Sequence, residues 1–88
     1  NSITLYGDFC DNCNLSGNDI QRLSSSSFEA CWISCLDNQY CTHLAFEKSN
    51  KNCWLKNKPK ISFSKSNLNY GAMSAIMDRS KNCTNAYD

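Results

Sequence analysis

The sequence has few residues that break regular structure and no long apolar run. Its 88 residues include one proline, three glycines and one histidine. No stretch approaches the roughly 18 apolar residues of a membrane-spanning helix, so we expect no membrane span. The first residues also lack the basic and apolar segments of a signal peptide. We therefore expect a mature form or an excised domain.

Cysteine, by contrast, is abundant. Seven of the 88 residues are cysteine, about 8%, which is near the level typical of disulfide-stapled folds. We expect one domain over residues 1–88, too small to be stabilised by its core alone. Two N-glycosylation sequons begin at Asn14 and Asn82. Together with the cysteines they indicate the secretory route and a secreted or cell-surface location.

Metal binding is one alternative role for the cysteines. Cys10-x2-Cys13 and Cys31-x3-Cys35 resemble a four-thiolate zinc layout. However, the second pair falls on the apolar stripe of a predicted helix, and three further cysteines would stay unexplained. We therefore expect no metal and no other cofactor.

Catalysis is a second alternative. The one histidine, His43, falls in a predicted strand, and no third group is evident that would orient its imidazole toward a cysteine nucleophile. Cys10-x2-Cys13 does not precede a helix in a βαβ pattern, so a thioredoxin-like redox site is not indicated. We expect no enzymatic activity.

Residues 27–37 are predicted to form a helix. Its apolar residues recur at the spacing of one helical face: Phe28, Cys31, Trp32, Cys35 and Leu36. Ser26 and Glu29 fit a capping box at the helix start. Asp37-Asn38 supplies a stop, because asparagine tolerates the left-handed conformation.

The remaining elements are predicted to be strands. They are expected over residues 3–6, near Leu15 and Ile20, and over 40–48, 53–56 and 70–77. Turn residues at 49–52 join 40–48 and 53–56 as a hairpin. Alternation in its first strand places Cys41, His43 and Ala45 on one face, and residues 56–69 read as an irregular connection.

Disulfides remain as the role of the cysteines. Cys35 ends the helix and Cys41 begins the next strand, so a short bridge across this turn is geometrically easy. Cys31 should face the sheet, and Cys53 lies on the strand that must pass under the helix. A bridge between them would close a loop of about 22 residues, worth roughly 3 kcal/mol in the chain-entropy model.

These residues resemble a known family. The run Ser-Ser-Phe-Glu-Ala-Cys-x3-Cys-x5-Cys-Thr-His-Leu-Ala-Phe-Glu, followed by Cys-Trp-Leu-Lys, closely resembles the PAN/apple domain. The segment 15–20 resembles that family's glycine–aspartate turn, and Gly71 to Ser74 with Cys83 resembles its closing strand. The resemblance covers about residues 3–83. It implies an α+β fold in which a single helix packs on a curved antiparallel sheet of about five strands, stapled by disulfides.

The resemblance also implies a disulfide pattern. Two core bridges are implied, matching Cys31–Cys53 and Cys35–Cys41, and apple domains add a bridge between the two ends of the module.

The end-to-end bridge is predicted to join Cys10 to Cys83, because Cys10 lies nearer to the usual place of the family's first cysteine. Cys13 would then be a buried free thiol on the same face as Leu15, or would bond to another chain. A direct Cys10–Cys13 bridge that leaves Cys83 unpaired is the alternative.

Members of the PAN/apple family are non-catalytic modules of secreted or cell-surface proteins that bind proteins or carbohydrates. The resemblance thus implies an extracellular recognition or adhesion module with a protein or glycan ligand. The alternative is a structural subunit of an extracellular glycoprotein assembly or filament, which would self-associate. We expect no nucleic-acid partner.

Charge is segregated along the chain although its net value is only +1. Residues 1–47 carry six acids and one base, and residues 48–88 carry eight bases and two acids. Two arrangements are open: the halves interleave in the fold and cancel, or the second half forms a basic patch for an anionic partner such as a sulfated glycan. The candidate patch, expected at the solvent surface, consists of Lys48, Lys51, Lys56, Lys58, Lys60 and Lys65.

Overall fold

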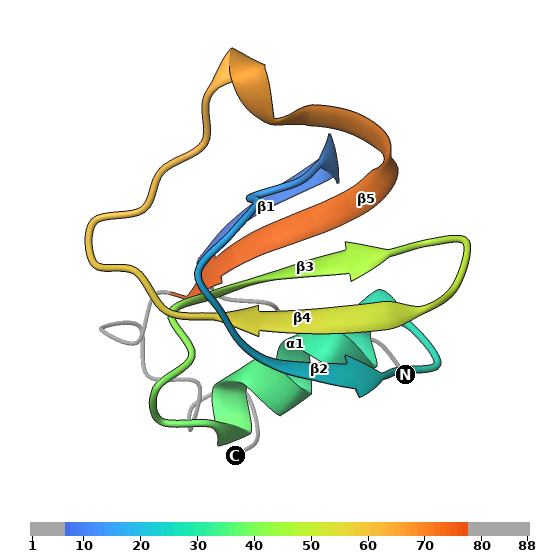
Figure 1. Cartoon of the computed structure of the whole chain (residues 1–88), viewed down its shortest axis with the longest axis vertical. Coiled ribbons are helices and arrows are strands. Elements are labelled where there is room, and N and C mark those ends of the chain that lie inside the picture. The colour runs from blue at the N-terminus through green and yellow to red at the C-terminus, as the bar shows by residue number, and fades with distance from the viewer. Residues whose placement is uncertain (1–6, 78–88) are drawn as a thin grey trace.

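The computed structural model describes residues 7–77, which form one antiparallel sheet with a single helix packed on it (Figure 1). The elements are β1 (Gly7–Cys13), β2 (Asp19–Ser24), α1 (Phe28–Asp37), β3 (His43–Glu47), β4 (Asn52–Lys56), a 3-10 turn η1 (Lys65–Asn67) and β5 (Leu68–Met77). The strand order is β1-β5-β3-β4-β2. The predicted α+β fold with five strands and disulfide staples is confirmed. The strand expected over 3–6 lies outside the described residues.

Helix α1 begins one residue later than predicted. Its N-cap is Ser27, whose hydroxyl accepts a hydrogen bond from the backbone N–H of Ala30 at 3.1 Å. The predicted capping box of Ser26 and Glu29 is therefore wrong, because Ala30 occupies the position three residues after the cap and has no side chain to reach back. Glu29 instead lies in the first turn, where its charge favours the helix dipole.

The helix end uses a different device from the predicted one. Asn38 is the C-cap, but its φ of −99° is not left-handed. Its side-chain oxygen accepts from the backbone N–H of Tyr40 at 2.9 Å, which turns the chain toward β3. Within the described residues, no helix is long and apolar enough to cross a membrane.

The core lies between α1 and one face of the sheet. Leu44 and Phe46 of β3 alternate toward the helix, and Phe28 packs edge-on against Phe46 with ring centroids 6.5 Å apart. Cys41 was predicted to share the face of His43, but it belongs to the helix-side core. The reason is that β3 begins at His43, so the alternation does not extend back to Cys41.

Two disulfides fasten the helix to the sheet. Cys31 is bonded to Cys53 of β4, with Cα atoms 5.4 Å apart, and Cys35 to Cys41, with Cα atoms 5.3 Å apart. All four residues are fully buried. These are the two core bridges that the resemblance implies.

Candidate functional site

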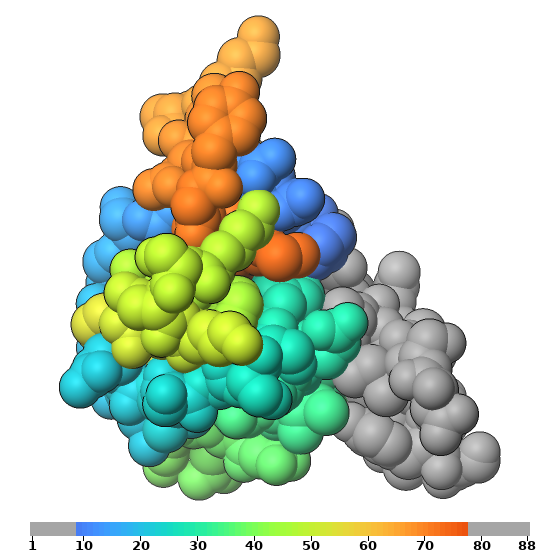
Figure 2. Space-filling model, turned by 90° about the vertical axis from the view of Figure 1, so that its right-hand side faces the viewer, coloured from blue at the N-terminus to red at the C-terminus, as the bar shows by residue number. Residues whose placement is uncertain are grey.

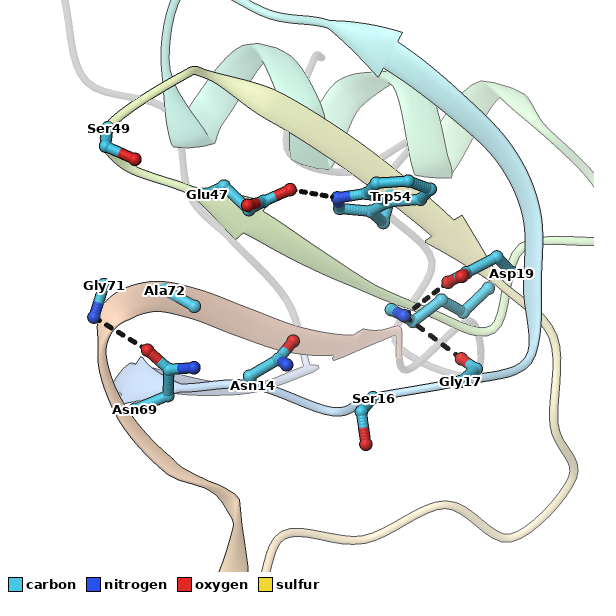
Figure 3. Close-up of a pocket in the computed structure, with 11 residues that line it drawn as sticks. Asn14, Ser16, Gly17, Asp19, Glu47, Ser49, Trp54, Asn69, Gly71 and Ala72 are labelled. Atoms are coloured by element: carbon cyan, nitrogen blue, oxygen red, sulfur yellow. Dashed lines mark hydrogen bonds and ion pairs between the residues drawn. The ribbon is translucent and has the colours of Figure 1, made fainter.

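A groove of about 400 Å³ lies on the face of the sheet opposite α1, which we call the groove face (Figure 3). The chain that leaves β1 crosses this face and forms one wall, and β5, β3 and β4 contribute the other lining residues. Most of its lining side chains are short and polar: Asn14, Ser16, Asp19, Glu47, Ser49 and Asn69. Trp54 adds an aromatic ring and Lys56 a cation.

The first wall is residues 14–18, held against the sheet by one buried side chain and a hydrogen-bond relay. Leu15 is buried, as predicted, and its backbone N–H donates to the Ser74 hydroxyl at 3.2 Å. That hydroxyl donates in turn to the carbonyl of Cys13 at 2.9 Å. The wall then turns at Gly17 and Asn18, both with positive φ, which glycine and asparagine adopt at low cost.

Lys56 lies at the base of the groove and is only 3% exposed. Its ammonium forms an ion pair with Asp19 and donates to the carbonyl of Gly17 at 3.1 Å. A buried cation is tolerated only when it is paired and hydrogen-bonded. Lys56 therefore ties the wall to β4 and leaves little charge for a ligand.

Glu47 and Trp54 form the other polar contact of the groove. The indole N–H of Trp54 donates to the Glu47 carboxylate, and the amides of Asn50 and Asn52 donate to it at 3.3 Å each. The indole hydrogen bond lowers the pKa of Glu47, so its carboxylate is ionised at neutral pH. The Arg22 guanidinium lies 6.0 Å from the centre of the indole ring. Together these contacts fix the orientation of the ring.

His43 is fully buried on the groove face, opposite Lys56 on β4. Its Nδ1 is 2.9 Å from the Thr42 hydroxyl, and its Nε2 has no hydrogen-bond partner among the described residues. Burial, followed by the nearby Lys56 charge, lowers the pKa of His43 to about 4. The imidazole is therefore neutral at physiological pH.

The cysteines of residues 7–77 provide no reactive thiol. All six form disulfides with one another. Within this part of the chain, no group of three cysteine, histidine or acidic side chains is placed to hold a metal ion. The arrangement is suited to binding through hydrogen bonds and stacking.

The predicted Cys10–Cys83 bridge is wrong, and so is the prediction of a free thiol at Cys13. Cys10 is bonded to Cys13. Three residues of a regular strand would span about 10 Å, but the β1–β5 register shifts between Asp11 and Cys13 and Asn12 has a positive φ of 63°. This bulge brings the two Cα atoms to 5.7 Å, within disulfide range. Cys83 lies outside the described residues.

The six candidate lysines do not form one solvent-facing patch. Lys56 is buried, contrary to its predicted exposure, because β4 turns it toward Asp19. Lys48 is half-buried and paired with Asp11 at 2.8 Å, which lowers the pKa of that carboxyl.

The remaining four lysines are exposed on separate parts of the fold. Lys51 lies in the β3–β4 turn, which faces the viewer in Figure 2, whereas Lys58 and Lys60 follow the opposite end of β4. Lys65 belongs to η1, on the projection at the top of that view. The negative first half and the positive second half of the chain thus interleave in part.

The two sequons differ in what the structure describes. Asn14 and Ser16 both line the groove, whereas Asn82 lies outside the described residues. The groove as a whole was not predicted from the sequence. The alternation of Cys53-Trp54-Leu55-Lys56 was a usable signal, because it places Trp54 and Lys56 together on the face that the disulfide does not occupy.

The family comparison agrees with this architecture. A family model described as the PAN domain matches residues 8–84, nearly the whole chain. Among curated proteins, none matches this sequence closely enough to count as a relative.

Proposed function

Because the chain belongs to the PAN domain family, whose members are non-catalytic protein- or carbohydrate-binding modules of extracellular proteins, we propose that it is an extracellular recognition module that binds a carbohydrate in the groove. On a cell surface such a module would serve adhesion. The density of disulfides supports a location in an oxidising compartment.

The observation that carries the proposal is the placement of Trp54 among short polar side chains. A sugar presents C–H groups on one face and hydroxyls around its edge. The negative face of an indole attracts polarised C–H groups. The amides and carboxylates of Asn14, Asn69 and Glu47 supply donors and acceptors for hydroxyls.

The charge of the groove favours a neutral sugar over a sulfated one. It holds two carboxylates, Asp19 and Glu47, and one ammonium, Lys56, a formal balance of −2 + 1 = −1. The ammonium is already paired with Asp19. An added sulfate would face Glu47 without a free cation among the described lining residues.

Binding to an array of neutral and sulfated glycans, followed by titration calorimetry, tests the proposal. Trp54→Ala should weaken binding about tenfold, since stacking contributes about 1.4 kcal/mol. Tyr70→Ala is the matched control, because Tyr70 is 74% exposed and lies outside the groove lining. Binding that survives Trp54→Ala, or preference for sulfated glycans, contradicts the proposal.

A structural subunit is the second candidate, and one observation favours it. The sequence has seven cysteines, and six of them pair within residues 7–77. Cys83 then has no cysteine left in this sequence and would bond outside it. A covalent dimer on a non-reducing gel that disappears with Cys83→Ser would support this candidate, whereas one labelled thiol per unfolded, unreduced chain would contradict it.

A further inference from the structure

The sequon Asn14-Leu15-Ser16 forms part of the groove wall, and this placement links a modification to the binding site. We propose that an N-glycan on Asn14 places its first sugar in the groove, so that glycosylation closes the site to external carbohydrate. This regulatory step rests on the proposed function of the groove.

The orientation of the wall supports this step. Leu15 is buried against the sheet, and in Figure 3 the side chain of Asn14 points into the space between the wall and β3, whereas the Ser16 hydroxyl points away from it. A sugar on the Asn14 amide nitrogen would therefore enter the groove rather than extend along the outer surface.

Hydrogen bonds to Asn67 hold the backbone of Asn14, whereas its side-chain amide forms no hydrogen bond with the described residues. Its N–H donates to the carbonyl of Asn67 at 2.8 Å, and its own carbonyl accepts from the Asn67 side chain at 3.4 Å. No hydrogen bond within residues 7–77 involves the Asn14 side-chain amide. A glycan there breaks no contact of the fold, and its attachment point is held in place.

The modification itself is a group transfer from a lipid-linked diphosphate oligosaccharide. The amide nitrogen of Asn14 bonds to C1 of the first sugar, the C1–O bond to the diphosphate breaks, and the lipid diphosphate leaves with the electron pair while the amide loses one proton. Ser16 supplies the hydroxyl that the sequon requires. Transfer to the chain before it folds avoids any limit on access to the groove.

The consequence is competition within one molecule. A group held by a short tether is present at an effective concentration in the millimolar range. The groove of about 400 Å³ is at the small end of ligand sites, so one sugar beside Trp54 excludes another. The glycosylated form should thus lose binding while keeping the fold.

Tryptophan fluorescence tests this occupancy without any ligand. Trp32 is only 2% exposed, so a neutral quencher such as acrylamide reports mainly on the half-buried Trp54. All proteins would carry Thr84→Ala, which removes the second sequon. The glycosylated protein from a eukaryotic secretory host would be compared with the same sequence made without glycosylation in a bacterial periplasm.

Mass spectrometry should show one glycan on Asn14, and the quenchable component should be lost in that form. Trimming the glycan to its first sugar should not restore quenching, since that sugar is the occupant. Ser16→Thr keeps the sequon and should stay shielded, whereas Ser16→Ala should be quenched. An unmodified Asn14, or equal quenching of both forms, overturns the inference.

A separate measurement distinguishes failure of the proposed function. If the unglycosylated protein binds no carbohydrate on the array, the proposed function fails, and the quenching result still decides whether the glycan occupies the groove. If it binds and the glycosylated form binds equally well, the regulatory step is overturned while the proposed function stands.

Discussion

Lowering the pH from 7 to 5 is expected to destabilise the fold, because His43 is buried in its neutral form. Its pKa is about 4 in the folded protein and about 6.5 in an unfolded chain. Between these values the unfolded state binds more protons, so the free energy of unfolding falls as pH falls. The full difference of about 2.5 pKa units corresponds to about 3 kcal/mol.

Most of this loss in the free energy of unfolding falls between pH 7 and 5, where few other ionisable groups change their protonation. Between pH 7 and 5 the expected loss from His43 is about 2 kcal/mol. Glu47 and Asp11 have lowered pKa values, so their contributions are present above the unfolded pKa, near 4.5 and 3.8, and are lost only as pH falls further. The segment of the curve above pH 5 therefore reports on the histidine.

Urea unfolding with intact disulfides at half-unit pH steps is the assay. His43→Gln keeps a polar side chain of similar size and removes the titration, so its stability should be nearly constant between pH 7 and 5. Parallel curves for the two proteins would refute the reasoning, as would a native imidazole that titrates near 6.5 by NMR. Either result would mean that water or a charge partner reaches the ring.

Three further changes test the stabilising contacts by urea unfolding. Replacing Cys31 and Cys53 together by Ala should cost about 3 kcal/mol or prevent secretion, because the bridge closes a loop of 22 residues; a loss under about 1 kcal/mol would contradict this estimate. Asp19→Ala should lower the free energy of unfolding by about 2 kcal/mol, because it leaves the buried Lys56 unpaired. The loss is smaller than for a fully buried pair because Asp19 is partly exposed. An unchanged urea midpoint would contradict this, because it would show that buried Lys56 does not need its partner. Ser27→Ala should lower the free energy of unfolding by about 1 kcal/mol, and Ser26→Ala should lower it by less than about 0.5 kcal/mol. A larger loss for Ser26→Ala than for Ser27→Ala would mean that Ser26 is the N-cap.

Helix α1 illustrates what the local sequence pattern can predict and what it cannot. The apolar spacing from Phe28 to Leu36 depends only on the 3.6-residue period, and it predicted the helix and its buried face. The four consecutive serines before it are chemically equivalent, so pattern alone misplaced the cap by one residue. The choice of Ser27 follows from where the chain leaves β2, where the N–H of Ser25 donates to the carbonyl of Lys51.

Strand β1 was missed for a related reason. Its sequence, Gly-Asp-Phe-Cys-Asp-Asn-Cys, is rich in residues with low strand propensity. It forms a strand because β5 pairs with it along most of its length, and the bulge at Asn12 is part of that pairing. The same bulge decided the partner of Cys10, which the sequence spacing left open between Cys13 and Cys83.

By itself the sequence determined the α+β class, the helix, the β3–β4 hairpin and the two core bridges that the family resemblance implied. These features depend on how often apolar residues recur along a helix or a strand and on the specific spacing of the cysteines. Only the tertiary structure decided the groove, because Asn14, Glu47, Trp54 and Asn69 are distant in the chain and meet only when β5 inserts between β1 and β3. Strand order depends on the packing of β3, β4 and β5 against α1 and on the pairing of the edge strands β1 and β2 with them, and no local stretch of residues encodes that arrangement.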